Sequence, residues 1–169
     1  WFRPMHLAAG PDGAIYIADL HREFVDPPSS LPETKANAAM QRRGNDRGRI
    51  YRLVPDNFKP PAAPRLEKAK TLDLLMNLAH LNGWHRDTAA RLLHEHQDKA
   101  AVPLLTNMLK AAKSPLARLH ALAALDGLGA LREADDVQGL RDTDERVRQR
   151  AVRLAGKFTS DGAAVSEAL

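Results

Sequence analysis

The chain has 169 residues and contains no cysteine. That absence excludes a disulfide, a thiolate metal site and a CxxCH haem-attachment motif within these residues. No apolar run approaches the roughly 18 residues that are needed to cross a bilayer, so we expect no membrane span in this segment. Aromatic residues make up only 5% of the chain, which leaves little surface for stacking on nucleic-acid bases.

What is present is the composition of a globular protein. Apolar residues account for 44% of the chain and charged residues for 27%, which lies outside the range of disordered sequences. The formal net charge of +4 is small and is spread over several segments, so it does not by itself indicate a nucleic-acid partner. The chain starts at Trp1 with neither an initiator Met nor a signal peptide, and we expect it to be an internal piece of a longer protein.

Residues 1–58 carry the pattern of short β-strands. An apolar run at Met5–Ala9 and a β-branched, aromatic run at Ala14–Ala18 are joined by Gly-Pro-Asp-Gly, which favours a tight turn. A third strand is predicted at Arg49–Val54. The Ala14–Ala18 run is apolar on both faces, so the sequence predicts neighbours on both sides of the sheet, and no later segment offers a second sheet.

Residues 59–70 are rich in Pro, Ala and Lys and are predicted to be a linker, after which the apolar period changes from two to 3.6. Residues 71–169 are therefore predicted to be all-α and cut short at the C-terminus. The expected fold class is mixed: a small antiparallel β-sheet followed by an α-solenoid of about three helical hairpins. Helices are expected at 71–81, 85–96, 98–112, 115–129, 133–141 and 144–157.

A short pattern recurs in the second helix of each predicted hairpin. An arginine is followed three residues later by an alanine, and an apolar residue comes about a turn after that; the arginines are 32 and 30 residues apart. The small alanine allows neighbouring helices to approach closely, and stacked hairpins bury apolar stripes that one hairpin leaves open. The repeated pairs are Arg86 and Ala89, Arg118 and Ala121, and Arg148 and Ala151.

The stretch "DTDERVRQRAVRLAGKF" resembles the second helix of a HEAT repeat, whose usual order is Asp, Val-Arg, Ala, then Leu-Gly. Here Asp142 or Asp144, Val147, Arg148 and Ala151 fill those places, with Leu154 and Gly156 after them. In HEAT repeats the Asp and Arg commonly tie neighbouring repeats together. The resemblance therefore implies a structural role, not a catalytic one, for Asp144 and Arg148.

The front of the chain, "WFRPMHLAAGPDGAIYIADLHREFVDPP" with "NDRGRIYRLVP", resembles the last β-propeller blade of the membrane-bound dehydrogenases of planctomycetes and verrucomicrobia. Those proteins are similar to quinoprotein (PQQ) sugar dehydrogenases, and "NGWHRDTAARLL" resembles their junction between propeller and HEAT region. The resemblance implies a parent enzyme that oxidises a sugar or alcohol in the periplasm or cell envelope. PQQ and Ca²⁺ are implied in the parent and haem c downstream, with no cofactor expected in this fragment alone.

In that reading the solenoid is a spacer or docking surface toward the haem domain, and this fragment alone is inactive. Its partners are the remaining blades, a cytochrome c domain of the same chain and a protein bound by the solenoid. The alternative is a HEAT scaffold for protein–protein contact with no catalytic role. Upstream blades and a downstream CxxCH motif would favour the enzyme.

Arg3 is the one cofactor-binding candidate. By resemblance, quinoprotein sugar dehydrogenases place arginines just before such a hairpin, where a guanidinium suits the anionic PQQ through bidentate hydrogen bonds. The alternative is a solvated arginine at a strand entry. His6 and His21 stand near strand ends and could line a pocket, but we assign neither a catalytic role, because the resemblance places the general base in an earlier blade.

Two clusters of ionisable residues look like metal sites, and we interpret both otherwise. Asp19 and Glu23 could offer carboxylates to Ca²⁺, but a salt-bridged loop is the preferred interpretation. The histidines of the solenoid lack zincin spacing and supporting carboxylates, so no metal is expected there. They are His80, His85, His94 and His96. Trp84, at a helix start, is predicted to pack into the first hairpin.

The last full helix has an apolar stripe and a basic one. The apolar stripe suits neighbouring helices, and the basic stripe suits water or an acidic partner. A phosphate backbone is the alternative ligand, but we do not expect nucleic acid because a second basic stripe and stacking aromatics are missing. The basic stripe comprises Arg146, Arg150, Arg153 and Lys157.

Overall fold

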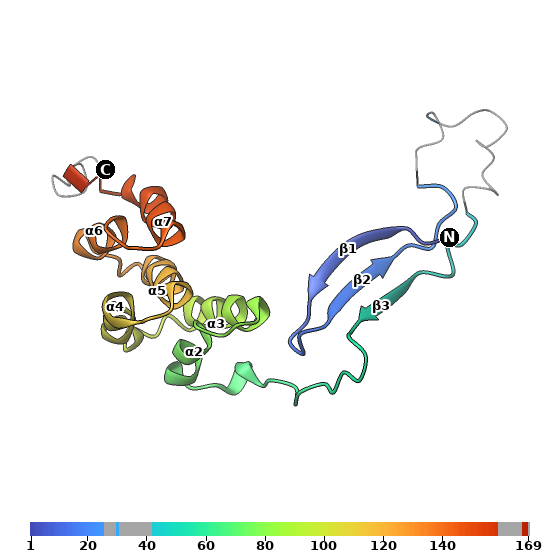
Figure 1. The fold of residues 1–169 in the computed structure, drawn as a ribbon, viewed down its shortest axis with the longest axis horizontal. Helices are drawn as coiled ribbons and strands as arrows, with labels where there is room; N and C mark the ends of the chain where they lie inside the picture. The colour runs from blue at the N-terminus through green and yellow to red at the C-terminus, as the bar shows by residue number, and fades with distance from the viewer. Residues whose placement is uncertain (26–29, 31–41, 159–166, 169) are drawn as a thin grey trace. The chain divides into compact units, whose positions relative to one another are not determined.

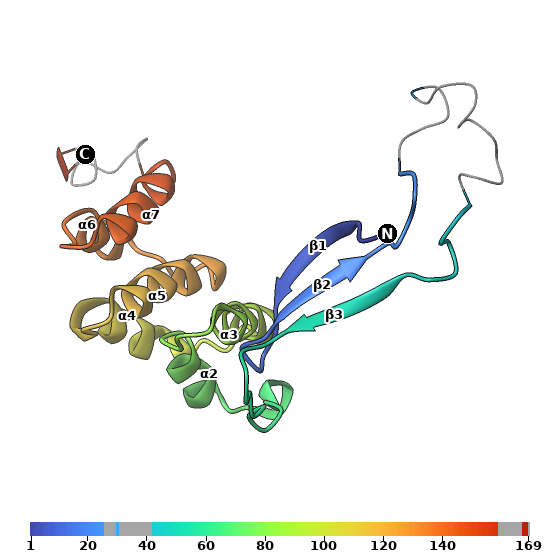
Figure 2. The ribbon, with the colours of Figure 1, turned by 45° about the vertical axis from the view of Figure 1, so that its right-hand side comes forward.

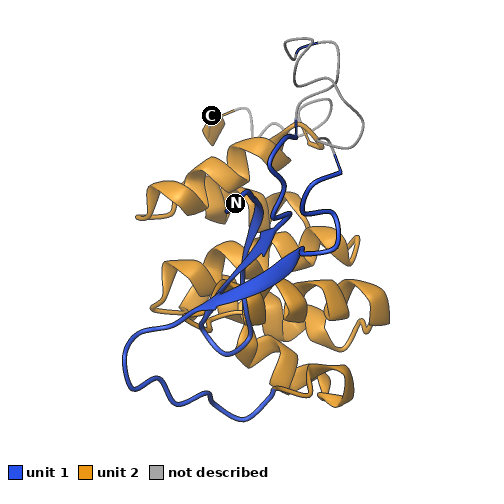
Figure 3. Ribbon diagram, turned by 90° about the vertical axis from the view of Figure 1, so that its right-hand side faces the viewer, with its two compact units in different colours: residues 1–63 blue, residues 64–169 orange. Residues whose placement is uncertain are grey.

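The computed structural model describes residues 1–25, 30, 42–158 and 167–168. The chain divides into two compact units, Trp1–Ala63 and Pro64–Leu169, which Figure 3 shows in different colours. The division falls inside the predicted linker. The second half of that linker belongs to the helical unit, because Leu66, in the short 3₁₀ helix Leu66–Lys68, is buried in the core there.

The first unit is a three-stranded antiparallel sheet in the order β1-β2-β3 (Figure 1). Its strands are β1 (Pro4–Ala9), β2 (Ile15–Asp19) and β3 (Arg49–Leu53). The Gly-Pro-Asp-Gly turn joins β1 to β2: the Gly10 amide donates to the Ala14 carbonyl at 2.8 Å. Gly13 has a φ of 84°, a left-handed conformation that a residue without Cβ adopts at little cost. The predicted hairpin and third strand are confirmed.

The strand register assembles one wholly apolar side of this sheet. Residues paired across antiparallel strands lie on the same face, and Leu7 pairs with Ile17, which pairs with Tyr51. Two strand positions further along, the same face continues with another apolar row. We call this the apolar sheet face; its members are Leu7, Ala9, Ile15, Ile17, Tyr51 and Leu53. It is open to solvent, with Leu7 62% and Leu53 58% exposed.

The second unit is built from helical hairpins whose order follows the prediction (Figure 2). Among the described residues there are six α-helices: α2 (Thr71–Asn77), α3 (Gly83–His96), α4 (Ala101–Ala111), α5 (Pro115–Gly127), α6 (Glu133–Leu140) and α7 (Glu145–Ala155). The predicted mixed fold, a small antiparallel sheet followed by a HEAT-like helical region, is confirmed.

Local capping explains where the observed helices differ from the predicted ones. Helix α3 begins two residues earlier than expected because the Asn82 side chain accepts a hydrogen bond from the Trp84 amide at 3.0 Å. Helix α4 begins three residues later, because the Asp98 side chain accepts from the Ala100 amide and holds that segment in a turn.

The repeated alanines lie where the hairpins meet. Ala89, Ala121 and Ala151 are each 0% exposed, and α5 contacts both α3 and α7. Within the last hairpin the fit is closest: a Cβ added at Gly139 of α6 would lie 3.0 Å from the Ala151 Cβ. Small side chains therefore set the distance between these helices, as the repeat pattern predicts.

Candidate functional site

The arginine of each repeat makes the same contact with its own hairpin. Each donates through Nη1 to the carbonyls of the residues six and five positions earlier: at 2.6 and 2.8 Å for Arg86, 2.8 and 3.1 Å for Arg118, and 2.9 and 3.0 Å for Arg148. Carbonyls after a helix C-terminus lack intrahelical donors, so a guanidinium there satisfies them. The repeated arginine thus joins the two helices of each hairpin.

Two of these arginines also reach the next hairpin. Arg118 makes a two-pronged ion pair with Asp142, with both N–O distances 2.7 Å. The Asp142 side chain is 4% exposed, and the hydrogen bonds from Arg118 hold the pKa of this carboxyl below its usual value. Arg86 Nε instead donates to His120 Nε2 at 3.2 Å. The contact between hairpins is therefore an ion pair at Arg118 and a hydrogen bond from a cation to an imidazole at Arg86.

Asp144 differs from the role that the HEAT resemblance implies for it. It caps α7 by accepting from the Arg146 amide at 2.9 Å and pairs with the Arg146 side chain at 2.8 Å. The side-chain hydrogen bond from Arg146 is the main reason that the pKa of Asp144 falls to about 2. The carboxylate that ties neighbouring hairpins is Asp142, because it precedes α7 and faces Arg118.

Arg3, the candidate PQQ ligand, donates to its own loop. Its Nε and Nη2 donate to the carbonyls of Arg22 and Glu23 at 3.3 and 3.0 Å. These two nitrogens form one of the two edges with which a guanidinium can bind a carboxylate in bidentate fashion. In the described geometry Arg3 uses this edge to hold the loop after β2.

The carboxylates near the end of β2 are engaged in local contacts. Asp19 is 3% exposed and accepts from the backbone amides of Arg3 and His21 at 2.7 and 2.9 Å. Burial acts to raise the pKa of Asp19, but these amides and nearby cations bring it below its usual value. Glu23 forms an ion pair with Arg43 at 3.0 Å. Local hydrogen bonds and ion pairs therefore engage the carboxylates of both Asp19 and Glu23. Among the described residues no three His, Asp or Glu side chains gather as a metal site would need.

The solenoid histidines have separate neighbours. His80 stacks on His85 with 4.0 Å between ring centroids, whereas His94 Nδ1 lies 2.8 Å from the Gly127 carbonyl. His96 is exposed. Trp84 is half-buried against the core and contacts His85 edge-on, in the place predicted for it.

Asp136 of α6 is a buried acid that the sequence pattern did not single out. It is 0% exposed, and neither carboxyl oxygen has a hydrogen-bond partner in the described part of the chain. Burial, with a smaller effect from Asp126, raises its pKa to about 6. The only available signal was its place in the acidic run Glu133–Asp136, and a run of charge at a helix start usually indicates a solvated end.

The stacked hairpins define an α-solenoid of HEAT type. The comparison with family models agrees: residues 70–155, about half of the chain, match the model described as HEAT repeats. The chain belongs to the HEAT repeat family. Residues 1–57 match a second model, described as a domain of unknown function (DUF7133). No curated protein and no solved structure matches the chain. In the described residues no helix has both the length and the hydropathy for crossing a membrane.

Proposed function

We propose that the chain joins the closing blade of a quinoprotein-type propeller to a HEAT scaffold within a longer sugar or alcohol dehydrogenase of the periplasm or cell envelope. The scaffold holds a protein partner, and in the parent that partner is an electron-accepting haem domain. HEAT repeats are typical of protein-interaction scaffolds, which is the coarser function on which this proposal builds.

The exposed apolar sheet face is the observation that carries the proposal. A three-stranded sheet that folds by itself has its apolar face covered by other parts of the chain. Each Leu-sized side chain contributes about 1.5–3 kcal/mol to stability when it is buried. Here four members of the apolar sheet face, Leu7, Ile15, Tyr51 and Leu53, are 41–62% exposed. A further sheet stacked on this one is the arrangement that strands of this kind adopt in propellers and sandwiches.

The cofactors belong to parts of the proposed parent outside the described residues. Arg3 has one of its two bidentate edges engaged with backbone carbonyls, and we derive no catalytic step through PQQ from this chain. PQQ with Ca²⁺, and haem c, are placed in the parent by the family resemblance alone.

The test is an assay of the full natural protein that contains this chain. Addition of PQQ and Ca²⁺ should produce aldose- or alcohol-dependent reduction of an artificial dye. Replacing Leu7 and Leu53 with Asp should abolish that activity, because charges on the apolar sheet face prevent sheet stacking. Val152→Asp, at a 53% exposed position on α7, is the matched control and should leave the activity intact. A folded parent with no PQQ-dependent activity would overturn the dehydrogenase proposal.

A scaffold without catalysis is the second candidate, favoured by an apolar groove between α2 and α4. The groove has a volume of about 350 Å³ and is lined by Leu72, Met76, Leu104 and their neighbours. Leu72 and Met76 are 59% and 69% exposed, and exposed apolar patches often mark protein interfaces. Failure of the dye assay together with retained partner binding would select this candidate.

A further inference from the structure

The groove between α5 and α7 combines one apolar side chain with several cationic ones. It has a volume of about 310 Å³, with Leu119 on the α5 side. The α7 side is polar and basic and consists of Arg146, Gln149, Arg150 and Arg153. None of its lining residues takes part in the Arg118–Asp142 ion pair or in the carbonyl contacts of the repeated arginines, so its charges need another explanation.

Half of the predicted basic stripe is neutralised within the solenoid. Arg146 pairs with Asp144, and Lys157 pairs with Asp126. Arg150 and Arg153 have no acceptor or ion-pair partner among the described residues. The unmet positive charge is thus concentrated on Arg150 and Arg153, two of the three arginines that line the groove.

Arg150 also has an unsatisfied donor. Its Nε is buried and has no hydrogen-bond partner in the described part of the chain. A buried N–H without an acceptor is unfavourable, and no carboxylate among the described residues neutralises this guanidinium. The neighbouring His120 responds to this environment: burial, followed by the charges of Arg86 and Arg150, lowers its pKa. The neutral form of the imidazole is therefore favoured, and it adds neither a positive nor a negative charge beside Arg150.

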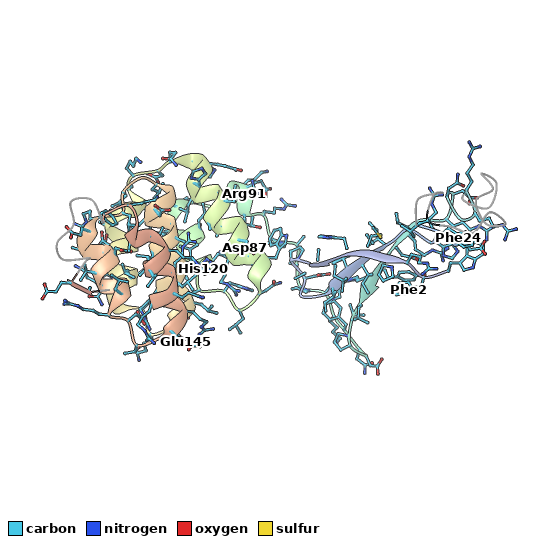
Figure 4. The ribbon with its side chains drawn as sticks, turned by 90° about the horizontal axis from the view of Figure 1, so that it is seen from above. Phe2, Phe24, Asp87, Arg91, His120 and Glu145 are labelled. Atoms are coloured by element: carbon cyan, nitrogen blue, oxygen red, sulfur yellow. The ribbon has the colours of Figure 1, made fainter. Side chains whose placement is uncertain are left out.

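On α3 and α5, the second helices of the other two hairpins, the positions equivalent to Arg150 and Arg153 are not both arginine. On α5 they hold His120 and Ala123, and on α3 they hold Thr88 and Arg91. Arg91 is compensated by Glu95 at 2.7 Å. Figure 4 labels residues of these helices, with Asp87 on α3, His120 on α5 and the acidic Glu145 at the start of α7. A nucleic-acid backbone needs a continuous row of cations, so this confined site favours a shorter ligand.

We infer that the α5–α7 groove binds an acidic peptide segment of a partner protein, with a carboxylate on Arg150 and Arg153 and a neighbouring apolar side chain on Leu119. Guanidinium–carboxylate hydrogen bonds are stronger than neutral ones and direct the ligand by their planar geometry. Gln149 directly precedes Arg150 in sequence and lines the same groove, where its amide can bond to a peptide backbone. The inference rests on the docking role proposed for the solenoid and does not need the dehydrogenase reaction.

The test is a fluorescence-anisotropy titration of the full chain with a short fluorescein-labelled peptide of alternating Asp and Leu. Saturable binding that weakens with salt is expected, and the Asn–Leu counterpart should not bind. Arg153→Gln should weaken binding about tenfold, and Arg150→Gln with Arg153→Gln should weaken it about a hundredfold. Arg91→Gln is the matched control, because Arg91 stands on α3 at the position equivalent to Arg153 and its charge is already compensated by Glu95. This variant should change binding less than about twofold.

Three outcomes would overturn the inference. They are no saturable peptide binding, binding that the Arg153→Gln variant does not change, and tighter binding of a labelled DNA duplex than of the peptide. Arg153 is exposed, so loss of binding in that variant does not arise from unfolding, and circular dichroism melts check this directly. The dye-reduction assay of the parent has an independent readout, so failure of either proposal leaves the other standing.

Discussion

At the scale of single residues, burial raises the pKa of Asp136 in α6 more than it raises the pKa of any carboxyl group on the surface. Its carboxyl group is buried in α6 and has no hydrogen-bond donor in the described part of the chain, so the neutral form is favoured and the pKa rises to about 6. In the unfolded chain the pKa of Asp136 is close to its ordinary value of 3.8. Asp136 therefore stabilises the fold in its protonated form, fully so below pH 3.8, and this contribution is lost as the pH rises through about 6.

Asp136→Asn should accordingly stabilise the chain more at neutral pH than in acid. The advantage of the variant over the natural chain should grow by up to about 3 kcal/mol between pH 4 and pH 7, because the variant has no charge to bury. Urea unfolding followed by circular dichroism at both pH values measures it. Asp87→Asn, at an exposed position, should show no such growth. An advantage that is the same at both pH values would mean that Asp136 is not buried as described.

At the scale of the helical elements, the arginine of each repeat links helices within a hairpin and, at Arg118, between hairpins. The sequence pattern located these arginines correctly by their spacing. It could not assign the acceptor, since Asp142 and Asp144 both precede α7 and differ by two positions. That choice depends on the angle at which the chain enters the helix, which directs Asp142 toward Arg118 and leaves Asp144 as the cap.

Asp142→Asn should destabilise the chain by about 3 kcal/mol or more, because it leaves the Arg118 guanidinium, 13% exposed, without its counter-charge. Because Arg118 depresses the pKa of Asp142, the loss should be full at neutral pH and shrink as the pH falls below 3.8. Urea denaturation provides the measurement. Glu95→Gln breaks the exposed pair with Arg91 and should change stability by less than about 1 kcal/mol. Equal effects of the two changes would contradict the role assigned to Asp142.

The close contact between Gly139 of α6 and Ala151 of α7 leads to a second prediction at this scale. Ala151→Leu should destabilise the chain by about 1–3 kcal/mol, since the space beside Gly139 has no room for a larger side chain. Val152→Leu, at the neighbouring 53% exposed position, is the control and should be nearly neutral. Thermal melts compare the two variants. A neutral Ala151→Leu would show that α6 and α7 can move apart without loss of packing.

At the scale of the whole molecule, the two units differ in how completely they bury their apolar residues. The helical unit has a core of leucines and alanines that are almost fully buried, whereas both outer strands of the sheet are exposed along their length. The sequence anticipated this contrast, because it showed a strand that was apolar on both faces and no second sheet to cover it. That contrast remains the main support for a parent protein with further sheets.

The isolated chain should therefore self-associate through the apolar sheet face. Replacing Leu7 and Leu53 with Lys should weaken association about tenfold or more, because the two leucines carry much of the exposed apolar surface. Sedimentation velocity over a range of concentrations measures this. Val152→Lys on the helical unit is the control and should leave association unchanged. A monomeric natural chain at all concentrations would contradict this role of the face.

The sequence by itself determined the order of strands and helices, the repeat unit and the place of the small residues, because these follow from local periodicity, turn chemistry and helix propensity. Only the tertiary structure decided that Arg3 holds a loop, that Asp142 meets Arg118 and that Asp136 is buried. It also decided that Arg150 and Arg153 lack ion-pair partners among the residues that the structure describes. Each of these facts depends on side chains brought together from distant segments or on what the packed chain covers. Spacing along the sequence does not record such contacts, because they form only when the elements pack.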